Sequence, residues 1–298
     1  RGRQRAFIKV QDGCRYRCTF CIVTVARGDE KSTPIAQIVD DINRFVDQGV
    51  KEVILTGVHL GGYGSDIQQN LAELIQAILD ETNVPRLRLG SLEPWDLPQN
   101  FFDLFSNPRL MPHLHLPLQS GSDSVLKRMA RRCKTEEFTQ IVAEARAKVP
   151  NINITTDIIV GFPGETEQEW QDSFNYIKSI NFGHIHIFTY SLRTGTKAAG
   201  LPDHVTNAVK KQRSQQLHKL AESMKNDFFQ QNKQQRFSVL WEGQKEEVSE
   251  TQHKIFGYTP NYLRVAAVVD KNQNYENQLS TVQIESLETD HLLARIIE

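Results

Sequence analysis

The order of apolar and polar residues divides most of the chain into alternating short strands and longer helices. Isoleucine and valine recur at helical spacing over 35–46, and 52–56 is an apolar run of strand length. The other segments that the pattern predicts are strands at 7–10, 87–91, 113–116, 152–160 and 184–190, and helices at 70–79, 96–105, 122–131, 135–148 and 166–180. Strands alternating with helices indicate an α/β fold with a parallel sheet. Six strands favour a partial (β/α)6 barrel over a closed eight-stranded one.

The pattern changes after a long polar helix predicted at 205–231. From Arg236 onward the chain shows short runs of strand length, at 236–241, 254–258, 262–269, 281–287 and 291–297. Such closely spaced strands predict a small antiparallel β-barrel. We therefore expect one domain at 1–232, which includes the connecting helix, and a second domain at 233–298.

The composition narrows the class of protein. With 298 residues, of which 39% are hydrophobic, the chain can build a packed core. It contains no apolar run near the roughly 18 residues of a membrane span. Three of its four cysteines are clustered, which does not resemble a secreted disulfide framework. Clustered free thiols suit a reducing compartment, so we expect a cytoplasmic protein with no membrane partner.

The charge is more informative in its distribution than in its sum. A net charge of −1 does not by itself indicate a nucleic-acid-binding protein. However, residues 1–31 carry eight Lys or Arg against three Asp or Glu, and 127–134 carries five Lys or Arg and no acid. Such clusters can contact phosphates. The alternative is a solvated basic helix face.

The clustered cysteines are Cys14, Cys18 and Cys21, with the spacing C-x3-C-x2-C. Three thiolates on one short loop can bind three irons of a [4Fe–4S] cluster and leave the fourth iron open for a substrate or cofactor. The alternative is structural zinc, which takes four protein ligands. The histidine nearest in sequence is His59. The spacing therefore favours an iron–sulfur cluster.

Several further segments match motifs of one known family. The cysteine loop has the bulky Phe20 directly before its last cysteine, as in radical S-adenosylmethionine (SAM) enzymes. The other matching segments are 5–14, 26–28, 113–123, 155–166, 190–196 and 257–262. Together they resemble the radical SAM methylthiotransferase family. The segments 5–13 and 257–262 are similar to the branch that adds a methylthio group to C2 of threonylcarbamoyladenosine, next to the tRNA anticodon.

This resemblance implies a [4Fe–4S] cluster on the three cysteines and SAM at its open iron. Family members carry a further N-terminal domain, whose three cysteines hold a second [4Fe–4S] cluster. Because the sequence starts at Arg1 without that domain, we expect a truncated chain that cleaves SAM but does not methylthiolate tRNA. The implied partners are the anticodon region of tRNA and an electron donor such as flavodoxin or ferredoxin.

The sequence leaves other functions open. Sister branches of the family act on isopentenyladenosine in tRNA or on an aspartate of a ribosomal protein. A different class is a non-catalytic RNA-binding module with a structural metal site. An electron-transfer protein fits poorly, because it needs neither an open iron nor a large barrel beside the cluster.

Candidate SAM contacts follow from the expected fold. In parallel α/β proteins, ligands bind beyond the carboxyl ends of the strands, and the cysteine loop follows the first strand. Gly57, Glu93 and Gln119 follow the second, third and fourth predicted strands. Asp157 begins a segment, 157–165, that resembles the one lining the adenine of SAM. We predict that these four residues bind the cofactor; the alternative is that they are caps or turn residues.

The predicted C-terminal barrel resembles a TRAM domain, which binds tRNA in this family. It carries seven Lys or Arg against ten Asp or Glu over 233–298, which weakens an electrostatic argument for RNA binding. Contact with RNA would then depend on Tyr258, Tyr262 and Arg264, by stacking or cation–π interaction. The alternative is that these residues pack the barrel.

Overall fold

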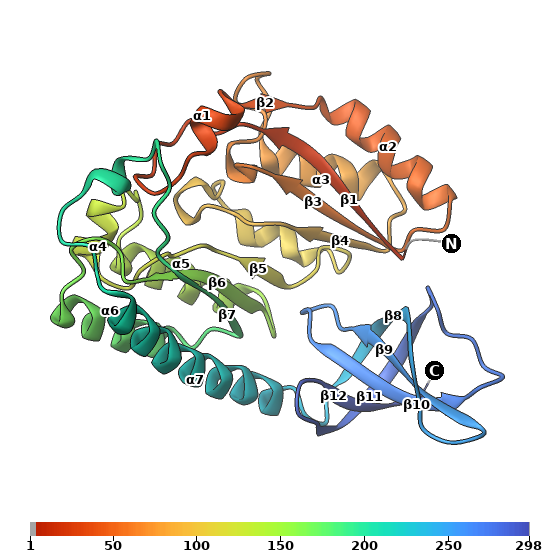
Figure 1. Ribbon diagram of the computed structural model, residues 1–298. Coiled ribbons are helices and arrows are strands. Elements are labelled where there is room, and N and C mark those ends of the chain that lie inside the picture. Colours follow the sequence, from red (N-terminus) through yellow and green to blue (C-terminus); the bar gives the residue numbers. More distant parts are fainter. Residues whose placement is uncertain (1–3, 298) are drawn as a thin grey trace.

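Six parallel strands form the larger part of the molecule. The computed structural model describes residues 4–297 (Figure 1). The strands are β1 (Arg5–Asp12), β3 (Glu52–Gly57), β4 (Arg86–Leu89), β5 (His113–His115), β6 (Asn153–Val160) and β7 (His184–Thr189). Two sheets, β1-β3-β4 and β5-β6-β7, are joined by parallel bridges between Leu87 and Leu110 and between Ser91 and His115. A short β2 (Lys31–Ser32) pairs antiparallel with β1 at the edge. The predicted partial (β/α)6 barrel is confirmed.

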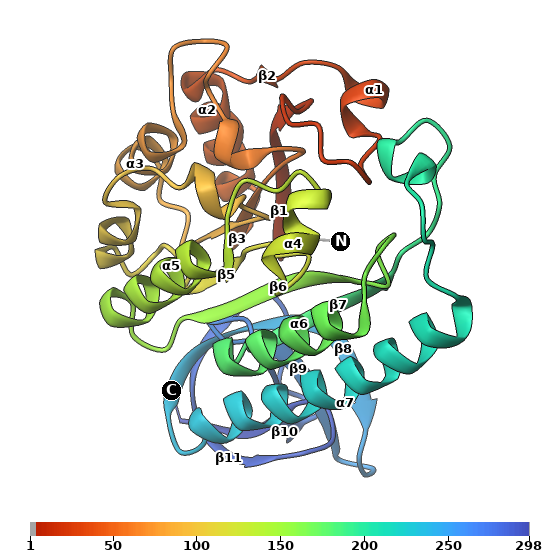
Figure 2. The ribbon, with the colours of Figure 1, turned by 90° about the vertical axis from the view of Figure 1, so that its left-hand side faces the viewer.

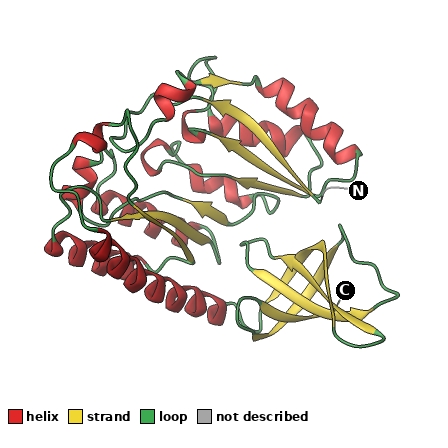
Figure 3. Cartoon of the chain, viewed as in Figure 1, coloured by secondary structure: helices red, strands yellow, loops and turns green. Residues whose placement is uncertain are grey.

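Helices cover the outer face of these strands (Figure 3). They are α2 (Ile35–Asp47), α3 (Leu71–Glu81), α4 (Asp123–Arg128), α5 (Thr135–Lys148) and α6 (Glu167–Ile180). The apolar side of α2 buries Ile38 and Ile42, as its helical spacing requires. Capping boxes at Asn70 and Thr166 begin α3 and α6, because the cap side chain and the glutamate three residues later satisfy two free backbone N–H groups. No helix in residues 4–297 is long and apolar enough to cross a membrane.

The helix predicted at 96–105 is wrong. The segment instead forms two 3-10 turns, η2 (Pro94–Asp96) and η3 (Phe101–Ser106). Pro98 has no N–H to donate and disfavours helical dihedral angles at Leu97, which is extended. Three other short helical segments did not emerge from the sequence pattern: α1 (Val23–Arg27), η1 (Leu60–Gly62) and η4 (Lys197–Gly200).

A closed β-barrel follows the long helix α7 (Asn207–Gln231). Its strands are β8 (Arg236–Glu247), β9 (Gln252–Tyr258), β10 (Arg264–Asp270), β11 (Leu279–Leu287) and β12 (Leu292–Ile296). They surround buried Trp241, Val265 and Ile284, and Phe229 near the end of α7 joins the same core. The barrel order is β10-β12-β11-β8-β9, and β10 pairs with β12 in parallel. The predicted small β-barrel is confirmed, and its pairs are antiparallel except for β10 and β12, because five strands in a ring cannot all alternate in direction.

This C-terminal barrel packs at the amino ends of the parallel strands (Figure 1). The rings of Tyr258 and Tyr262 stack on each other with centroids 4.8 Å apart. The guanidinium of Arg5 lies 4.6 Å from the Tyr258 ring, and that of Arg88 lies 4.4 Å from the Tyr262 ring. Arg264 is engaged elsewhere, over the ring of Phe256 at 4.5 Å. Tyr258 and Tyr262 thus pack against the parallel barrel, and Arg264 packs within its own barrel. Contact of these side chains with RNA stays a prediction.

Glu52 holds the arginines of this contact together. Its buried carboxylate lies 2.7 Å from Arg5, 3.1 Å from Arg88 and 3.6 Å from Arg86. Burial alone would raise the pKa of Glu52, but the three guanidinium groups outweigh burial and lower it to about 2. Arg86 also donates hydrogen bonds to the carbonyl oxygens of Tyr258 and Ser238. The base of the parallel barrel is therefore closed by a charged network, and the rim at the carboxyl ends faces away from the C-terminal barrel.

Candidate functional site at the cysteine loop

The loop that carries Cys14, Cys18 and Cys21 leaves the carboxyl end of β1 (Figure 2). Its entry is tight, because Gly13 has φ +77° and a Cβ there would lie 2.0 Å from the carbonyl oxygen of Asp29. A glycine is therefore required at this position. The backbone N–H of Cys21 donates to the carbonyl of Cys18 at 3.0 Å, and the chain then enters α1. The cysteines thus lie at the rim where the expected fold places a ligand.

The surroundings of the sulfurs fit an iron–sulfur cluster. The three thiols are free and partly exposed. The backbone N–H of Tyr16 lies 3.4 Å from Cys14 Sγ, and the Arg131 guanidinium lies 3.8 Å from Cys18 Sγ. Burial raises the pKa of Cys14 to about 11 and also raises that of Cys18, so iron binding has to release these protons. No three His, Cys, Asp or Glu side chains in residues 4–297 are close enough to hold one metal ion. The N–H donors suit the thiolates of a cluster, whose properties they tune.

A cavity of about 370 Å³ opens directly beside Cys21. Two of the predicted SAM contacts, Gln119 and Asp157, line it. Its apolar walls include Phe20, Ile159 and Phe188. Gln119 has φ +77° and bridges to β6, because its N–H donates to the Asp157 carbonyl at 2.8 Å. Apolar walls with a few fixed polar groups suit a ligand that combines a flat ring with polar edges.

The other two predicted contacts lie outside that cavity. Glu93 follows β4, and its Oε2 is 3.1 Å from the Arg131 guanidinium, which also reaches Cys18. Gly57 ends β3, where an added Cβ would lie 3.0 Å from the side-chain oxygen of Gln11. The structure therefore brings Gln119 and Asp157 together, places Glu93 on the Cys18 side, and places Gly57 against Gln11 at the end of β3.

Arg131 is a site residue that sequence reasoning missed, since it appeared only as one of the cations at 127–134. Its guanidinium lies 4.3 Å from the Trp95 ring and donates to the carbonyl of Pro117. It is thereby fixed between Glu93 and Cys18. The only signal in the sequence was the position of the basic segment after the fourth strand.

A second set of residues that the sequence did not reveal connects the cysteine loop to the neighbouring strand ends by hydrogen bonds. The buried ring of His59 contacts Glu30 through Nδ1 at 2.5 Å and Asp96 through Nε2 at 2.6 Å. Asp96 in turn accepts a hydrogen bond of 2.7 Å from the hydroxyl of Tyr16, within the cysteine loop. Burial alone would lower the pKa of His59, but the two carboxylates outweigh burial and raise it. A protonated His59 therefore bridges two acids and positions the loop through Tyr16.

A row of histidines lies below Asp157 on the same face of the sheet. His115 Nε2 is 3.2 Å from the Asp157 carboxylate, and its ring centroid is 5.4 Å from that of His186. The ring centroid of His184, two residues earlier on β7, lies 4.7 Å from that of His186. Burial lowers the pKa of His184 to about 4 and also lowers that of His186. These two rings are thus neutral near pH 7 and give the inner wall polar groups without charge.

The chain is similar in sequence to curated proteins that are named as enzymes of tRNA methylthiolation. It is 37% identical over 266 residues to the threonylcarbamoyladenosine tRNA methylthiotransferase MtaB of Bacillus subtilis, covering 88% of this chain and 59% of that protein. It is 41% identical over 224 residues to the protein of the same name from Thermotoga maritima, covering 74% and 52%. It is 35% identical over 246 residues to the tRNA-2-methylthio-N(6)-dimethylallyladenosine synthase of Staphylococcus aureus, covering 81% and 48%. The chain spans about half the length of these curated relatives.

Solved structures show the same fold at low identity. Coproporphyrinogen III oxidase from Escherichia coli, described as a radical SAM enzyme, superposes with a TM-score of 0.56 at 14% identity, covering 74% of this chain and 53% of that one. The radical SAM methyltransferase TsrM from Kitasatospora setae superposes with a TM-score of 0.55 at 18% identity, covering 65% of this chain and 38% of that one.

The sequence model of the radical SAM superfamily matches residues 8–177, which is more than half of the sequence. The chain therefore belongs to the radical SAM superfamily.

Proposed function

We propose that this chain is the radical SAM and TRAM-like part of a tRNA methylthiotransferase that modifies C2 of threonylcarbamoyladenosine next to the anticodon. One observation carries the proposal: three free cysteines lie at the rim, and Cys21 among them lines a cavity together with Gln119 and Asp157. Two of the relatives described above bear the name of this activity. We place the protein in the cytoplasm, with tRNA and a flavodoxin or ferredoxin as partners.

In this proposal Cys14, Cys18 and Cys21 hold three irons of a [4Fe–4S] cluster, and SAM binds at the remaining one. Once an electron donor had reduced it, the bound cluster would supply with SAM the radical chemistry that removes a hydrogen atom from adenine C2. Glu93 lies beside Cys18, where its carboxylate can accept a hydrogen bond from the amino group of SAM. Gly57 is proposed as a further contact for the methionine part of SAM, through its backbone, since Gln11 and Leu60 fill the space beside its Cα.

The cavity residues position the adenosine part of the cofactor. The side chains of Gln119 and Asp157 offer hydrogen-bonding groups to the base and the ribose. Phe20 and Ile159 cover the ring and exclude water, which would otherwise compete for the polar groups. Arg131 donates to Cys18 and thereby stabilises its thiolate form.

The complete reaction in this family needs a second cluster, on three further cysteines, and a second SAM that methylates the sulfur. Outside the cysteine loop, the sequence contains one cysteine, Cys133, which is buried in the core. We therefore expect the chain of 298 residues to cleave SAM without methylthiolating tRNA. Methylthiolation by this chain alone, detected by nucleoside mass spectrometry, would contradict that part of the proposal.

Anaerobic reconstitution with iron and sulfide tests the assignment of cofactors. We expect about four irons per chain and formation of 5′-deoxyadenosine from SAM under a reductant. Asp157→Asn should reduce SAM cleavage at unchanged iron content, whereas Asp172→Asn, at an exposed position on α6, should leave both unchanged. One bound zinc with no SAM cleavage would instead support a non-catalytic RNA-binding module.

The substrate branch is tested with RNA. Stem–loops that carry threonylcarbamoyladenosine or isopentenyladenosine should differ in binding, with the first bound more tightly. Preference for isopentenyladenosine would move the chain to the branch of the Staphylococcus aureus relative. If the chain bound neither RNA, the proposed tRNA substrate would be wrong. The SAM cleavage assay would then still test the assignment of cofactors.

A further inference from the structure

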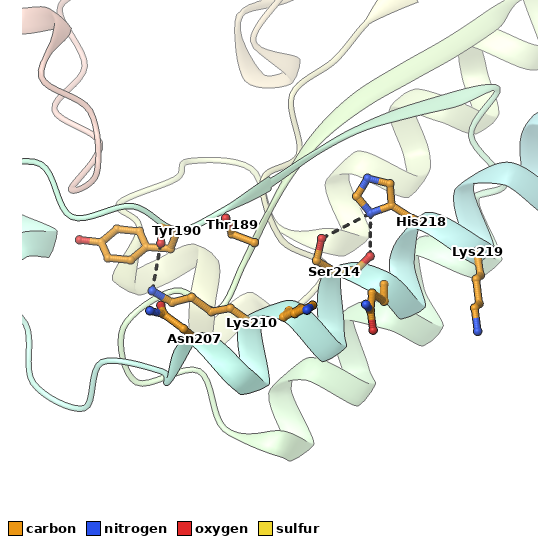
Figure 4. A pocket seen from close by; sticks show the side chains of 9 residues that line it. Thr189, Tyr190, Asn207, Lys210, Ser214, His218 and Lys219 are labelled. Carbon is orange, nitrogen blue, oxygen red and sulfur yellow. Dashed lines mark hydrogen bonds between the residues drawn. The ribbon is translucent and has the colours of Figure 1, made fainter.

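A second cavity, of about 830 Å³, lies between α7 and the end of β7 (Figure 4). Thr189 and Tyr190 line both this cavity and the one beside Cys21, so the two spaces adjoin. The remaining lining residues all come from α7: Asn207, Lys210, Lys211, Ser214, Gln215, His218 and Lys219. A groove thus leads from the cofactor cavity along the connecting helix.

The helix face that forms this groove is polar throughout. Its residues recur at the three- and four-residue spacing of one helix face, which in a covered helix would be apolar. The apolar face of α7 is a different one, where Leu217, Ala221 and Met224 are buried. The polar face therefore lies beside the packed face, and its side chains can make hydrogen bonds and ion pairs with a ligand in the groove.

The charge of the groove has one sign. Lys210, Lys211 and Lys219 line it, and no Asp or Glu does. Lys210 is partly engaged, because its Nζ donates to the carbonyl of Tyr190 at 3.0 Å, as Figure 4 shows. Lys211 and Lys219 are exposed, and neither forms an ion pair with a carboxylate in residues 4–297. Arg193, exposed at the adjoining cavity, also lacks such a pair within this range. These cations are free to neutralise an anionic ligand.

An exposed aromatic ring stands where the groove meets the cofactor cavity. Phe188 is 53% exposed and lines the cavity beside Cys21. Grooves that bind single-stranded nucleic acid combine cations along the backbone with aromatic faces on which bases stack. The lysines and Phe188 provide both elements, in the order that a strand entering the cofactor cavity would require.

We propose that this groove binds the sugar–phosphate backbone of the RNA strand that carries the target adenosine, with Lys211 and Lys219 contacting phosphates. This inference rests on the proposed function, since it assumes an RNA substrate. An acidic electron-donor protein is the competing partner for a basic surface. The groove favours RNA, because it is concave and shares Thr189 and Tyr190 with the cavity that the reacting base has to reach, whereas a reductant needs only to approach the cluster.

The test is the salt dependence of RNA binding. Fluorescence anisotropy would measure the Kd of an anticodon stem–loop RNA for the full chain, the Lys211→Gln/Lys219→Gln variant and a control. The control, Lys178→Gln/Lys233→Gln, removes the same charge at two exposed positions away from the groove. Lys210 is kept, because its contact with Tyr190 supports the fold.

Each phosphate contact on a single strand contributes about 0.7 to the slope of log K against log salt. The groove variant should therefore lose about 1.4 of that slope and bind roughly 25-fold more weakly near 0.1 M salt, with the difference vanishing near 1 M. The control should match the unmodified chain.

Equal slopes for the groove variant and the unmodified chain would overturn the proposal, as would an equal loss in the control. Unchanged RNA binding with slower reduction of the cluster by flavodoxin would assign the groove to an acidic protein instead. If the unmodified chain bound no RNA near 0.1 M salt, this inference and the tRNA substrate would both fail, while SAM cleavage would stand on its separate assay.

Discussion

Replacing Glu52 by glutamine tests whether charge neutralisation holds the two barrels together. Glu52 is fully buried at the base of the parallel barrel, within 3.6 Å of Arg5, Arg86 and Arg88. Glutamine has nearly the same shape and can still accept hydrogen bonds, so the substitution mainly removes one negative charge. Three guanidinium groups would then lie together beside the stacked tyrosines of the C-terminal barrel, with the partly exposed Glu242 on Arg5 as the remaining counter-charge.

The size of the effect follows from the pKa of Glu52. Because that pKa falls from 4.5 to about 2, the folded chain favours the charged carboxylate by about 3 kcal/mol. A depressed pKa contributes stability that is present above the unfolded value and is lost as the pH falls toward the folded one. We therefore expect the variant to be about 3 kcal/mol less stable near pH 7, with a smaller difference below pH 4.5.

Urea unfolding followed by circular dichroism, near pH 7 and again near pH 3.5, would measure this difference. Glu242→Gln is the matched control, because Glu242 also pairs with Arg5, at 2.6 Å, but its side chain is 30% exposed. Screening by solvent should limit its loss to less than about 1 kcal/mol. Equal losses for the two variants, or a loss at Glu52 that does not change with pH, would refute the electrostatic account.

Two further predictions concern the cysteine loop. His59→Leu leaves two buried carboxylates without their shared partner, so we expect a loss of about 3 kcal/mol in urea unfolding and a lower iron content after reconstitution. Because the pKa of His59 is raised on folding, its contribution should be complete below about pH 6.5 and decline as the pH rises further, and a flat profile for the unmodified chain would contradict this. Gly13→Ala places a methyl group 2.0 Å from a backbone oxygen and should abolish iron binding in the same assay. Gly28→Ala, with a similar φ of +74° but no atom within 4 Å of the new Cβ, should retain iron and lose about 1–3 kcal/mol from backbone strain. Equal iron loss in both variants would show that backbone strain, not the clash, decides.

The parallel barrel could be predicted because its signals are local. Each strand and helix carries its own periodicity, and residues such as Asn70 and Thr166 mark helix starts with capping chemistry that acts within four residues. The spacing of the three cysteines is equally local. The position of Gln119 could be inferred from a strand end and that of Asp157 from the resemblance of segment 157–165, and the structure places both in the cavity beside Cys21. Their binding of SAM stays a prediction.

The residues that hold the cysteine loop in place could not be predicted, because their contacts join segments that are distant in sequence. His59 meets Glu30 and Asp96 only after three separate loops converge at the rim. Arg131 reaches Cys18 across more than a hundred residues, and no periodicity records that contact. Tyr258 and Tyr262 contact the arginines of the parallel barrel because their surface of the C-terminal barrel faces it. The packing of the two domains decides which surface faces inward, and the sequence around each tyrosine does not record it.

Helix α7 restricts how the length of this chain can vary. It has 25 residues, about 37 Å, and is fixed at both ends: Lys210 donates to Tyr190 at the rim, and Phe229 is buried in the core of the C-terminal barrel. Inserting or deleting one residue near its middle would shift one end by about 1.5 Å and rotate it by roughly 100°. Only one set of end contacts could then survive. Changes in length should therefore be tolerated in the exposed loops at 248–251 and 271–274, and excluded from α7.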